Sequence, residues 1–309
     1  MNPDVLVAVF LTVITASTPL LLAALGELVT ERAGVLNLGV EGMMLMGAVV
    51  GFAVTLTTGQ WGLGVLAAAL AGAGLALVFG VLTLTLVANQ VATGLALTIF
   101  GIGVSSLIGA GFVGKPLPPL PRLAVPGLSD LPVVGRLLFG QDLLVYLSLV
   151  MTGVVAFVLN RTRIGLVLRA VGQSDVSAHA IGYPVIRIRY GAVLFGGVMS
   201  GLAGAYLSLA YTPLWVQEMT AGRGWIALAI VVFAAWRPGR ALVGAYLFGG
   251  ITILQLYAQG AGWLPVPSQI FSMLPYLATI LVLVIISAGP WRRRLDAPAC
   301  LGKPFRPAA

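Results

Sequence analysis

The sequence predicts an all-α fold, a polytopic membrane helical bundle of roughly 8–10 transmembrane helices. Three observations support this: 59% of the residues are hydrophobic and only 8% are charged, the mean hydropathy is +1.05, and apolar runs of near-bilayer length recur along the chain. A water-soluble fold could not cover 309 residues with so few charged side chains, whereas lipid can. We therefore expect one transmembrane domain over residues 1–309, in a multi-pass protein of the cell membrane.

The chain carries a net charge of +8, which in a soluble protein would suggest nucleic acid as a partner. In a membrane protein the same excess reflects cytoplasmic loops that face anionic lipid. We therefore expect the lipid bilayer as a partner, and no nucleic acid.

Four membrane segments are expected before the first long connection. Val5–Leu25 is the first span, and Pro19 should kink it. Gly26–Leu56 is the second; its first half is polar and interrupted by glycine, its second half is apolar, and it could be partly re-entrant. Gly62–Val87 and Val91–Phe112 are the third and fourth spans.

The connection Val113–Gln141 is rich in proline, a composition that excludes a helix. Irregular backbone of this length cannot lie in hydrocarbon, so we expect an external connection outside the bilayer. Leu143–Leu159 is short but can span, and it leads directly to a basic loop.

The loop Asn160–Tyr190 concentrates the positive charge between two apolar spans. Because Lys and Arg are retained on the cytoplasmic side, we expect this loop to be cytoplasmic. It holds five arginines and the only histidine of the chain: Arg161, Arg163, Arg169, Arg187, Arg189 and His179.

Two short helices are expected inside this loop. A helix through Leu166–Val171 would end at Gly172, and a second over Val176–Ile181 would start after Ser174 or Asp175 as its N-cap. Two short helices joined by glycine make a compact knob suited to docking into a groove of another protein. The alternative is an ordinary loop whose arginines serve only topology, and the residues alone leave both open.

The chain after the loop alternates apolar and polar segments. Gly191–Tyr211 carries two ladders of small residues at four-residue spacing, a pattern typical of tight helix packing. Trp225–Trp236 is too short to span, so we expect it to continue a helix begun in the polar segment Thr212–Gly224. Ala241–Tyr257 and Ile270–Ser287 are the last spans.

The tail Trp291–Ala309 is again basic. Counting spans from a cytoplasmic loop at 160–190 puts this tail inside the cell, and puts the connection at 113–141 and the N-terminus outside.

Enzymatic chemistry finds little support in the sequence. Gly109–Pro116 approaches a phosphate-binding loop but ends in proline, where the motif needs a hydroxyl for magnesium. A single Cys300 and a lone His179 cannot form a metal site. Glu27 and Glu31 have helical spacing and are expected to cap the membrane end of a helix near Arg32. We therefore expect a non-enzymatic chain with no catalytic residues, cofactor or metal of its own.

Polar groups at membrane depth are costly and are candidates for a solute path. Hydroxyls and amides suit a neutral, hydrogen-bonding solute such as a nucleoside or a sugar. The alternative is that Asn37 and Glu41 pair only with nearby backbone or with Arg32. The candidate path residues are Asn37, Glu41, Asn89, Gln90, Thr93, Trp215, Gln217 and Glu218.

Two motifs carry a resemblance to a known family. The run Arg169-Ala-Val-Gly172, followed by Ala178-x-Ala-Ile-Gly182, resembles the cytoplasmic coupling region of the permeases of ABC importers for branched-chain amino acids, simple sugars and nucleosides. The sequence departs from the family pattern Arg-Ala-x-Gly-Glu-Asn at Gln173 and Ser174. The segment Gly26–Gly47 is similar to the nucleoside, purine-type branch of the family.

The resemblance implies a permease subunit that pairs with a second permease. It implies cytoplasmic ABC ATPase subunits that bind ATP and Mg, and an extracytoplasmic substrate-binding protein. The implied cargo is a nucleoside; alternatives are a simple sugar, a branched-chain amino acid, an ion-coupled secondary transporter that uses Glu41, or a membrane scaffold. The residues that the resemblance assigns to ATPase coupling are Arg169, Gly172, Asp175, Ala178, Ala180 and Gly182.

Overall fold

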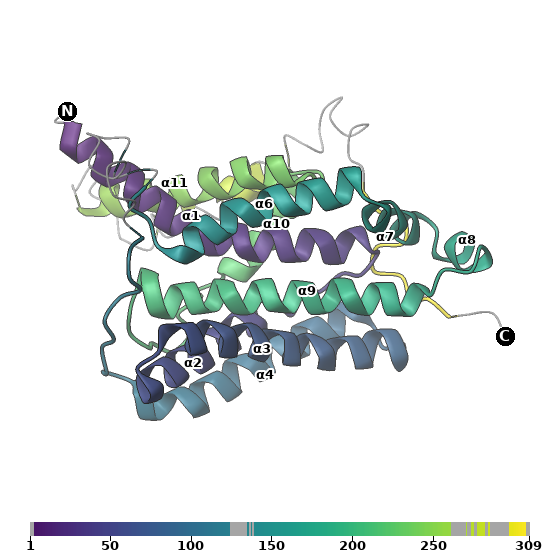
Figure 1. Ribbon diagram of the computed structural model, residues 1–309, viewed down its shortest axis with the longest axis horizontal. Coiled ribbons are helices and arrows are strands. Elements are labelled where there is room, and N and C mark those ends of the chain that lie inside the picture. Colours follow the sequence, from purple (N-terminus) through teal and green to yellow (C-terminus); the bar gives the residue numbers. More distant parts are fainter. Residues whose placement is uncertain are drawn as a thin grey trace.

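The computed structural model describes residues 3–123, 135, 137, 139–260, 270, 273–274, 277–281, 284 and 297–306. Within these residues the chain is a helical bundle without strands, and its long helices run side by side along the long axis (Figure 1). Seven of the described helices are long and apolar enough to cross a bilayer. The predicted all-α polytopic membrane bundle is therefore confirmed.

α1 (Pro3–Arg32) is one continuous helix, and α2 (Val40–Thr58) begins only after a short loop. The prediction of Gly26–Leu56 as one membrane segment is therefore wrong: its first residues complete α1, and its apolar part forms α2. The helix can continue through Glu27 and Glu31 because both carboxylates are buried and accept hydrogen bonds from other parts of the chain.

α3 (Trp61–Gly80) and α4 (Gln90–Gly109) match the third and fourth predicted spans closely. A π-helical turn (Val81–Thr85) extends α3, and a 3-10 turn (Ala110–Phe112) extends α4. The Asn89 side chain caps α4 by accepting a hydrogen bond from its first turn.

The proline-rich connection after α4 lies partly outside the described residues. Gly135 and Leu137 are helical, and the Phe139 backbone N–H donates to the Gly135 carbonyl at 2.8 Å. The prediction that this connection holds no helix is therefore wrong here. The helical turn forms because it lies after Pro132, the last proline of the connection.

α6 (Leu143–Arg161) leads into two short helices, α7 (Arg163–Gln173) and α8 (Asp175–Ala180). They match the two helices predicted in the basic loop, and the Ser174 side chain caps α8 as expected. Gly172, predicted to end the first helix, lies inside α7 instead.

α9 (Val185–Tyr206), extended by a π-helical turn (Leu207–Tyr211), runs through the centre of the bundle (Figure 1). It begins earlier than the predicted Gly191, so Arg187 and Arg189 belong to this helix and not to the loop.

The small residues of α9 let three other helices approach it closely. A β-carbon added at Gly196 would overlap α1, one at Gly201 would overlap α3, and one at Gly204 would overlap α2. The ladders seen in the sequence are therefore helix-packing positions.

α10 (Arg223–Phe233) is too short to span, and α11 (Pro238–Gly260) is a long helix. The prediction that the short helix starts within the preceding polar segment is confirmed, but the helix begins only at Arg223, because Gly222 has left-handed backbone (φ 80°) and the residues before it form turns. The predicted span Ile270–Ser287 lies largely outside the described residues; those described at 270, 274, 277–281 and 284 are helical.

The two ends of the bundle differ. α7, α8 and the described tail, residues 297–306, lie at one end, referred to as the basic end, and the N-terminus lies at the opposite end (Figure 1). Between the ends, α3, α4 and α6 expose large apolar side chains such as Leu70, Ile99 and Phe157. Such surfaces suit contact with lipid or with another membrane subunit.

Candidate functional site

α2 starts inside the bundle and not at its end. In the loop between α1 and α2, the Asn37 backbone N–H donates to Oε1 of Glu27 at 3.0 Å. The Leu38 carbonyl accepts from the Thr98 hydroxyl at 3.0 Å, and Thr98 lies about 12 Å along α4 from its first residue, at 1.5 Å per residue. The N-terminus of α2 therefore lies at membrane depth, as do the ends of discontinuous helices in transporters that bind solutes between them.

The N-terminus of α10 meets that of α2, and the Glu41 carboxylate joins them. This carboxylate accepts hydrogen bonds from the Thr220 hydroxyl and from the backbone N–H groups of Gly222 (2.8 Å) and Gly224 (2.6 Å). Both helix N-termini carry partial positive charge, so one carboxylate stabilises both. The contact needs glycine, because a β-carbon at Gly224 would lie 2.7 Å from Cα of Glu41. This cluster is referred to as the Glu41 cap.

The protein's own donors occupy the Glu41 carboxylate in this conformation. Both oxygens accept hydrogen bonds, and the residue is only 6% exposed. Within the described part of the chain, no group of three His, Cys, Asp or Glu could hold a metal ion. The carboxylate therefore acts as an anchor between the two helices.

A second polar cluster joins α1 to the turn between α10 and α11. Oε2 of Glu31 accepts a hydrogen bond from the Trp236 indole N–H, and Nε of Arg32 donates to the Trp236 carbonyl at 3.2 Å. Glu31 and Arg32 are both buried. The expected membrane-end cap near Arg32 thus binds a turn about two hundred residues away in sequence. This turn is centred on Trp236, a residue that sequence reasoning did not single out.

The residues assigned to ATPase coupling divide into an inner and an outer group. Asp175 and Ala178 are buried. Gly172 is buried too, and a β-carbon there would lie 2.1 Å from the Arg32 carbonyl oxygen. Ala180 and Gly182 are exposed, and Arg169 is half-buried.

The outer surface of this knob around α8 is apolar at two positions that sequence reasoning did not single out. Val176 and Ile181, on and just after α8, are 71% and 72% exposed. Exposed aliphatic side chains on a short, well-braced helix suit docking against another protein.

Arg189 connects the knob to the rest of the bundle. Its Nη2 forms an ion pair with Oδ2 of Asp175 at 3.0 Å, and its Nε donates to the Ala33 carbonyl at 3.1 Å. Its guanidinium also lies 5.8 Å from the Phe305 ring centroid. Arg189 itself is 1% exposed. This cluster, referred to as the Arg189 node, joins α8, α9, the loop before α2 and the tail.

The tail braces the same helices. The Cys300 backbone N–H donates to the Gly172 carbonyl at 2.9 Å, and the Phe305 ring lies edge-on to His179 with centroids 5.6 Å apart. Sequence reasoning treated Arg189 as a loop arginine and the tail only as a basic segment. The apolar residues Cys300, Leu301 and Phe305 within that basic tail were the available signal of a packed segment.

Comparison with known proteins identifies the family. A family model described as branched-chain amino acid transport system / permease component matches residues 9–283. The chain belongs to this permease family. The permease is 45% identical to a putative glucose ABC transporter permease protein of Haloferax volcanii, over 93% of this chain and 94% of that protein.

Two further relatives transport other solutes according to their names. The permease is 32% identical to a guanosine ABC transporter permease protein of Bacillus subtilis, over 94% of this chain and 93% of that protein. It is 33% identical to a nucleoside ABC transporter permease protein of Lactococcus lactis subsp. cremoris, over 87% of this chain and 89% of that protein. The chain is therefore a multi-pass membrane permease subunit of an ABC transporter.

The predicted path residues of the permease do not all lie together in the described part of the chain. Asn37 is buried beside the start of α2, where its side-chain oxygen accepts from the Gly39 backbone N–H at 2.9 Å. Near the basic end, the buried Gln90 side chain accepts from the Leu36 backbone N–H at 2.8 Å, Asn89 is an exposed helix cap, and Thr93 is half-buried.

The remaining path candidates lie in the segment before α10. Trp215 is fully buried and packs with Leu45 and Phe52 of α2. A β-carbon at Gly109 of α4 would overlap the Trp215 ring, so this tryptophan fills the space between α2 and the end of α4. Gln217 and Glu218 are exposed.

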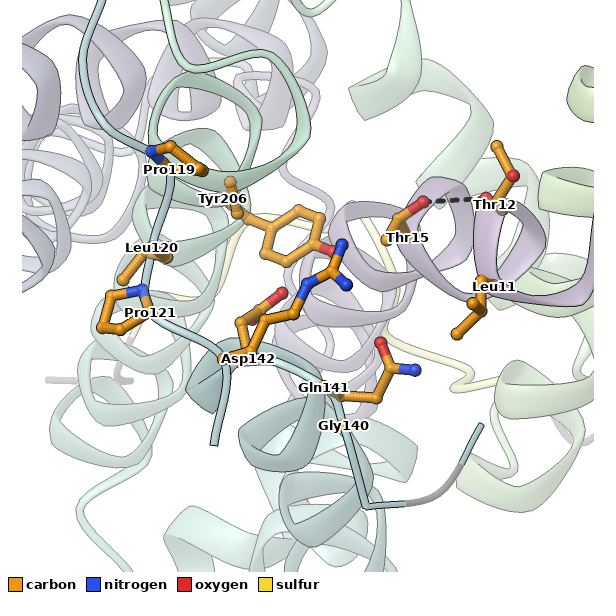
Figure 2. Close-up of a pocket in the computed structure, with 12 residues that line it drawn as sticks. Leu11, Thr12, Thr15, Pro119, Leu120, Pro121, Gly140, Gln141, Asp142 and Tyr206 are labelled. Carbon is orange, nitrogen blue, oxygen red and sulfur yellow. Dashed lines mark hydrogen bonds between the residues drawn. The ribbon is translucent and has the colours of Figure 1, made fainter. Parts of the chain in front are cut away.

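A cavity of about 560 Å³, lined by both polar and apolar residues, lies among α1, α9 and the two ends of the proline-rich connection. Tyr206 and Asp142 project into it from α9 and from the start of α6 (Figure 2). Burial raises the pKa of the Asp142 carboxyl, although the N–H groups of the first turn of α6 partly offset this by donating to it. Thr15 and Arg122 also line the cavity, which is therefore rich in hydrogen-bonding groups.

Proposed function

We propose that this permease pairs with a second permease subunit to form the membrane path of an ATP-driven importer, and that cytoplasmic ATPase subunits dock on α7 and α8. The observation that carries the proposal is the knob itself, which presents Val176 and Ile181 outward while Asp175 and Ala178 are buried beneath them. A permease without a phosphate-binding motif must receive its driving force through such a contact.

The Arg189 node provides a route from this contact to the path. A displacement of α8 would move Asp175, and with it Arg189 and the Ala33 carbonyl that Arg189 binds. Ala33 begins the loop that re-enters the bundle and starts α2, whose N-terminus is held at the Glu41 cap. Docking can drive transport only if this contact differs in energy between the two states of the path.

The positive-inside rule supports the orientation. The basic end carries exposed Arg161, Arg163 and Arg187, so we place it in the cytoplasm together with the tail. The opposite end, with the connection at 113–141, then faces outward, where a substrate-binding protein would dock. ATP and Mg would be bound by the ATPase subunits.

For the cargo we propose a neutral solute that contains a sugar ring, with nucleosides as the first candidate. The guanosine and nucleoside permeases among the relatives support it. The cavity between Tyr206 and Asp142 supports it too, because its hydroxyl, carboxyl, amide and guanidinium groups can bind the hydroxyls of a sugar. A simple sugar is the second candidate, favoured by the 45% identity to the putative glucose permease.

The docking proposal is tested by substituting the two exposed aliphatic residues on and just after α8, Val176 and Ile181. Val176→Arg with Ile181→Arg should prevent co-purification of the ATPase and abolish solute uptake in proteoliposomes of the assembled transporter, while the permease still inserts. Val216→Arg, at an apolar position 47% exposed before α10, is the matched control. Normal ATPase binding by the double variant would overturn the proposal.

The cargo is tested by uptake of radiolabelled guanosine, radiolabelled glucose and radiolabelled leucine into the same proteoliposomes. Guanosine uptake that unlabelled nucleosides inhibit, and glucose and leucine do not, would support the first candidate. Glucose uptake alone would replace it with the second candidate, and leucine uptake alone would contradict both.

A further inference from the structure

A large apolar groove opens on the surface of the permease near the basic end, between α6, α7 and α9. Its volume is about 740 Å³. Aliphatic and aromatic side chains line it, among them Val155 of α6, Leu168 of α7, and Ile188 and Phe195 of α9. These residues belong to helices that cross the membrane or adjoin one that does, so the groove faces the leaflet at the basic end.

Two arginines lie at the end of the groove where the membrane helices stop. Arg163 begins α7 directly after α6, and Arg187 lies in the first turn of α9. Both line the groove together with Tyr183, and both are exposed. Neither has a carboxylate within ion-pair distance among the described residues. The groove is thus apolar along the membrane helices and cationic at its mouth.

We propose that this groove binds an anionic phospholipid. Its acyl chain lies along α6 and α9, and its phosphate lies between Arg163 and Arg187. The arrangement matches both parts of such a lipid, because apolar surface is buried against the chain while two unpaired cations meet the headgroup. The proposal rests on the membrane location of the permease and holds whatever solute the path carries.

A helix of another membrane subunit fits the groove less well. Such a helix would cover Arg163 and Arg187 and remove them from water, and a buried cation without a partner is strongly unfavourable. A lipid leaves both guanidinium groups at the membrane surface, where long basic side chains are stable.

The headgroup contact is tested with the full-length permease in nanodiscs that contain equal amounts of phosphatidylglycerol and phosphatidylcholine. Native mass spectrometry then counts the molecules of each lipid that stay bound when the permease is released from the nanodisc. The wild type should retain phosphatidylglycerol preferentially, by roughly fivefold for each arginine. Arg163→Gln with Arg187→Gln should remove the preference, whereas Arg161→Gln with Arg306→Gln, exposed arginines outside the groove, should keep it. An unchanged preference in the first variant would overturn the proposal.

The acyl-chain contact is tested with a matched pair of glycines. Gly191 lines the groove, Gly153 does not, and a β-carbon at either would meet no atom within 4 Å. Gly191→Leu should fill the groove and lower the number of retained phospholipids of both kinds, while Gly153→Leu should leave it unchanged.

The last test asks whether protein, not lipid, occupies the groove in the assembled transporter. A cysteine introduced at Gly191 should form no cross-link to another subunit of the assembled transporter. Disulfide or bifunctional cross-linking of this cysteine to a second permease chain would overturn the lipid assignment.

Discussion

The Glu41 cap and the Arg189 node both join distant parts of the chain through a buried charged side chain, but they are built differently. Glu41 is held by a hydroxyl and two backbone N–H groups that are fixed at the start of α10. Arg189 is held by one carboxylate, one backbone carbonyl and one aromatic ring, each from a different element. The first arrangement locks two helix ends together, whereas the second can change partners when one element moves.

The location of the two clusters strengthens this difference. The Glu41 cap lies at membrane depth, where an unsatisfied donor has no water to bind. The Arg189 node lies at the basic end, beneath the exposed knob. We infer that the Glu41 cap holds the N-termini of α2 and α10 in place. We infer that the Arg189 node transmits movement of α8 to α2. Substitutions in each cluster distinguish these two roles.

The largest expected effect follows removal of the Glu41 carboxylate. Glu41→Ala leaves the donors of Thr220, Gly222 and Gly224 without a partner, at about 1–3 kcal/mol each in a buried site. We expect a much lower melting temperature of the purified permease, and loss of transport. Glu41→Gln, which keeps an acceptor, should lose less stability. Glu218→Gln, at an exposed glutamate, should keep the wild-type melting temperature. A stable Glu41→Ala variant would show that the cap does not hold the helices.

The next effect concerns coupling more than stability. Arg189→Gln leaves Asp175 buried without its cation, a change that typically costs about 3–5 kcal/mol for a buried pair. Adding Asp175→Asn removes the unpaired charge, so the double variant should melt higher than Arg189→Gln alone. If the Arg189 node transmits movement of α8 to α2, the double variant should still hydrolyse ATP in the assembled transporter but move less solute per ATP. A wild-type ratio of solute to ATP would assign the node a structural role only.

A smaller effect is expected where the knob contacts the end of α1. Gly172→Ala places a β-carbon 2.1 Å from the Arg32 carbonyl oxygen, and overpacking of this kind costs about 1–3 kcal/mol. The control is Gly74→Ala in α3, where a β-carbon meets no atom within 4 Å and alanine favours the helix. Chemical denaturation should show Gly172→Ala destabilised and Gly74→Ala unchanged or stabilised. Equal stability of the two variants would mean that α7 can move away from α1 freely.

Sequence reasoning predicted the parts of this molecule that depend on neighbours along the chain. The cap at Ser174, the short helices on either side of it and the small-residue ladders of α9 follow from local chemistry and helical periodicity. The partners of Glu41 could not be predicted in the same way, because Thr220 and Gly224 lie 179 and 183 residues away in sequence. The break before α2 was suggested by its glycines, but its position was not.

The path residues show the same limit. Polar side chains in apolar segments were identified correctly as unusual, yet Gln90 and Trp215 turned out to lie in separate places, one bound to the loop before α2 and the other packed against α2. Composition indicates that such side chains need partners. Only the packing of helices in space determines which partners they find.

The smallest expected effect tests whether the tail belongs to the Arg189 node. Phe305→Ala removes the ring that lies 5.8 Å from the Arg189 guanidinium and 5.6 Å from the His179 ring, contacts worth about 0.5–2 kcal/mol for a cation over an aromatic face. The permease should melt slightly lower, because the Asp175 ion pair and the Ala33 hydrogen bond still hold Arg189. Phe305→Tyr keeps the ring and should restore the wild-type melting temperature, and Arg306→Gln, at the exposed neighbour, should not change it.

If the tail also limits the movement of α8, Phe305→Ala should lower the solute moved per ATP by more than its stability loss predicts. An equal amount of solute moved per ATP in Phe305→Ala and Phe305→Tyr would show that the tail has a structural role only. The Asp175–Arg189 ion pair would then be the part of the node that transmits movement.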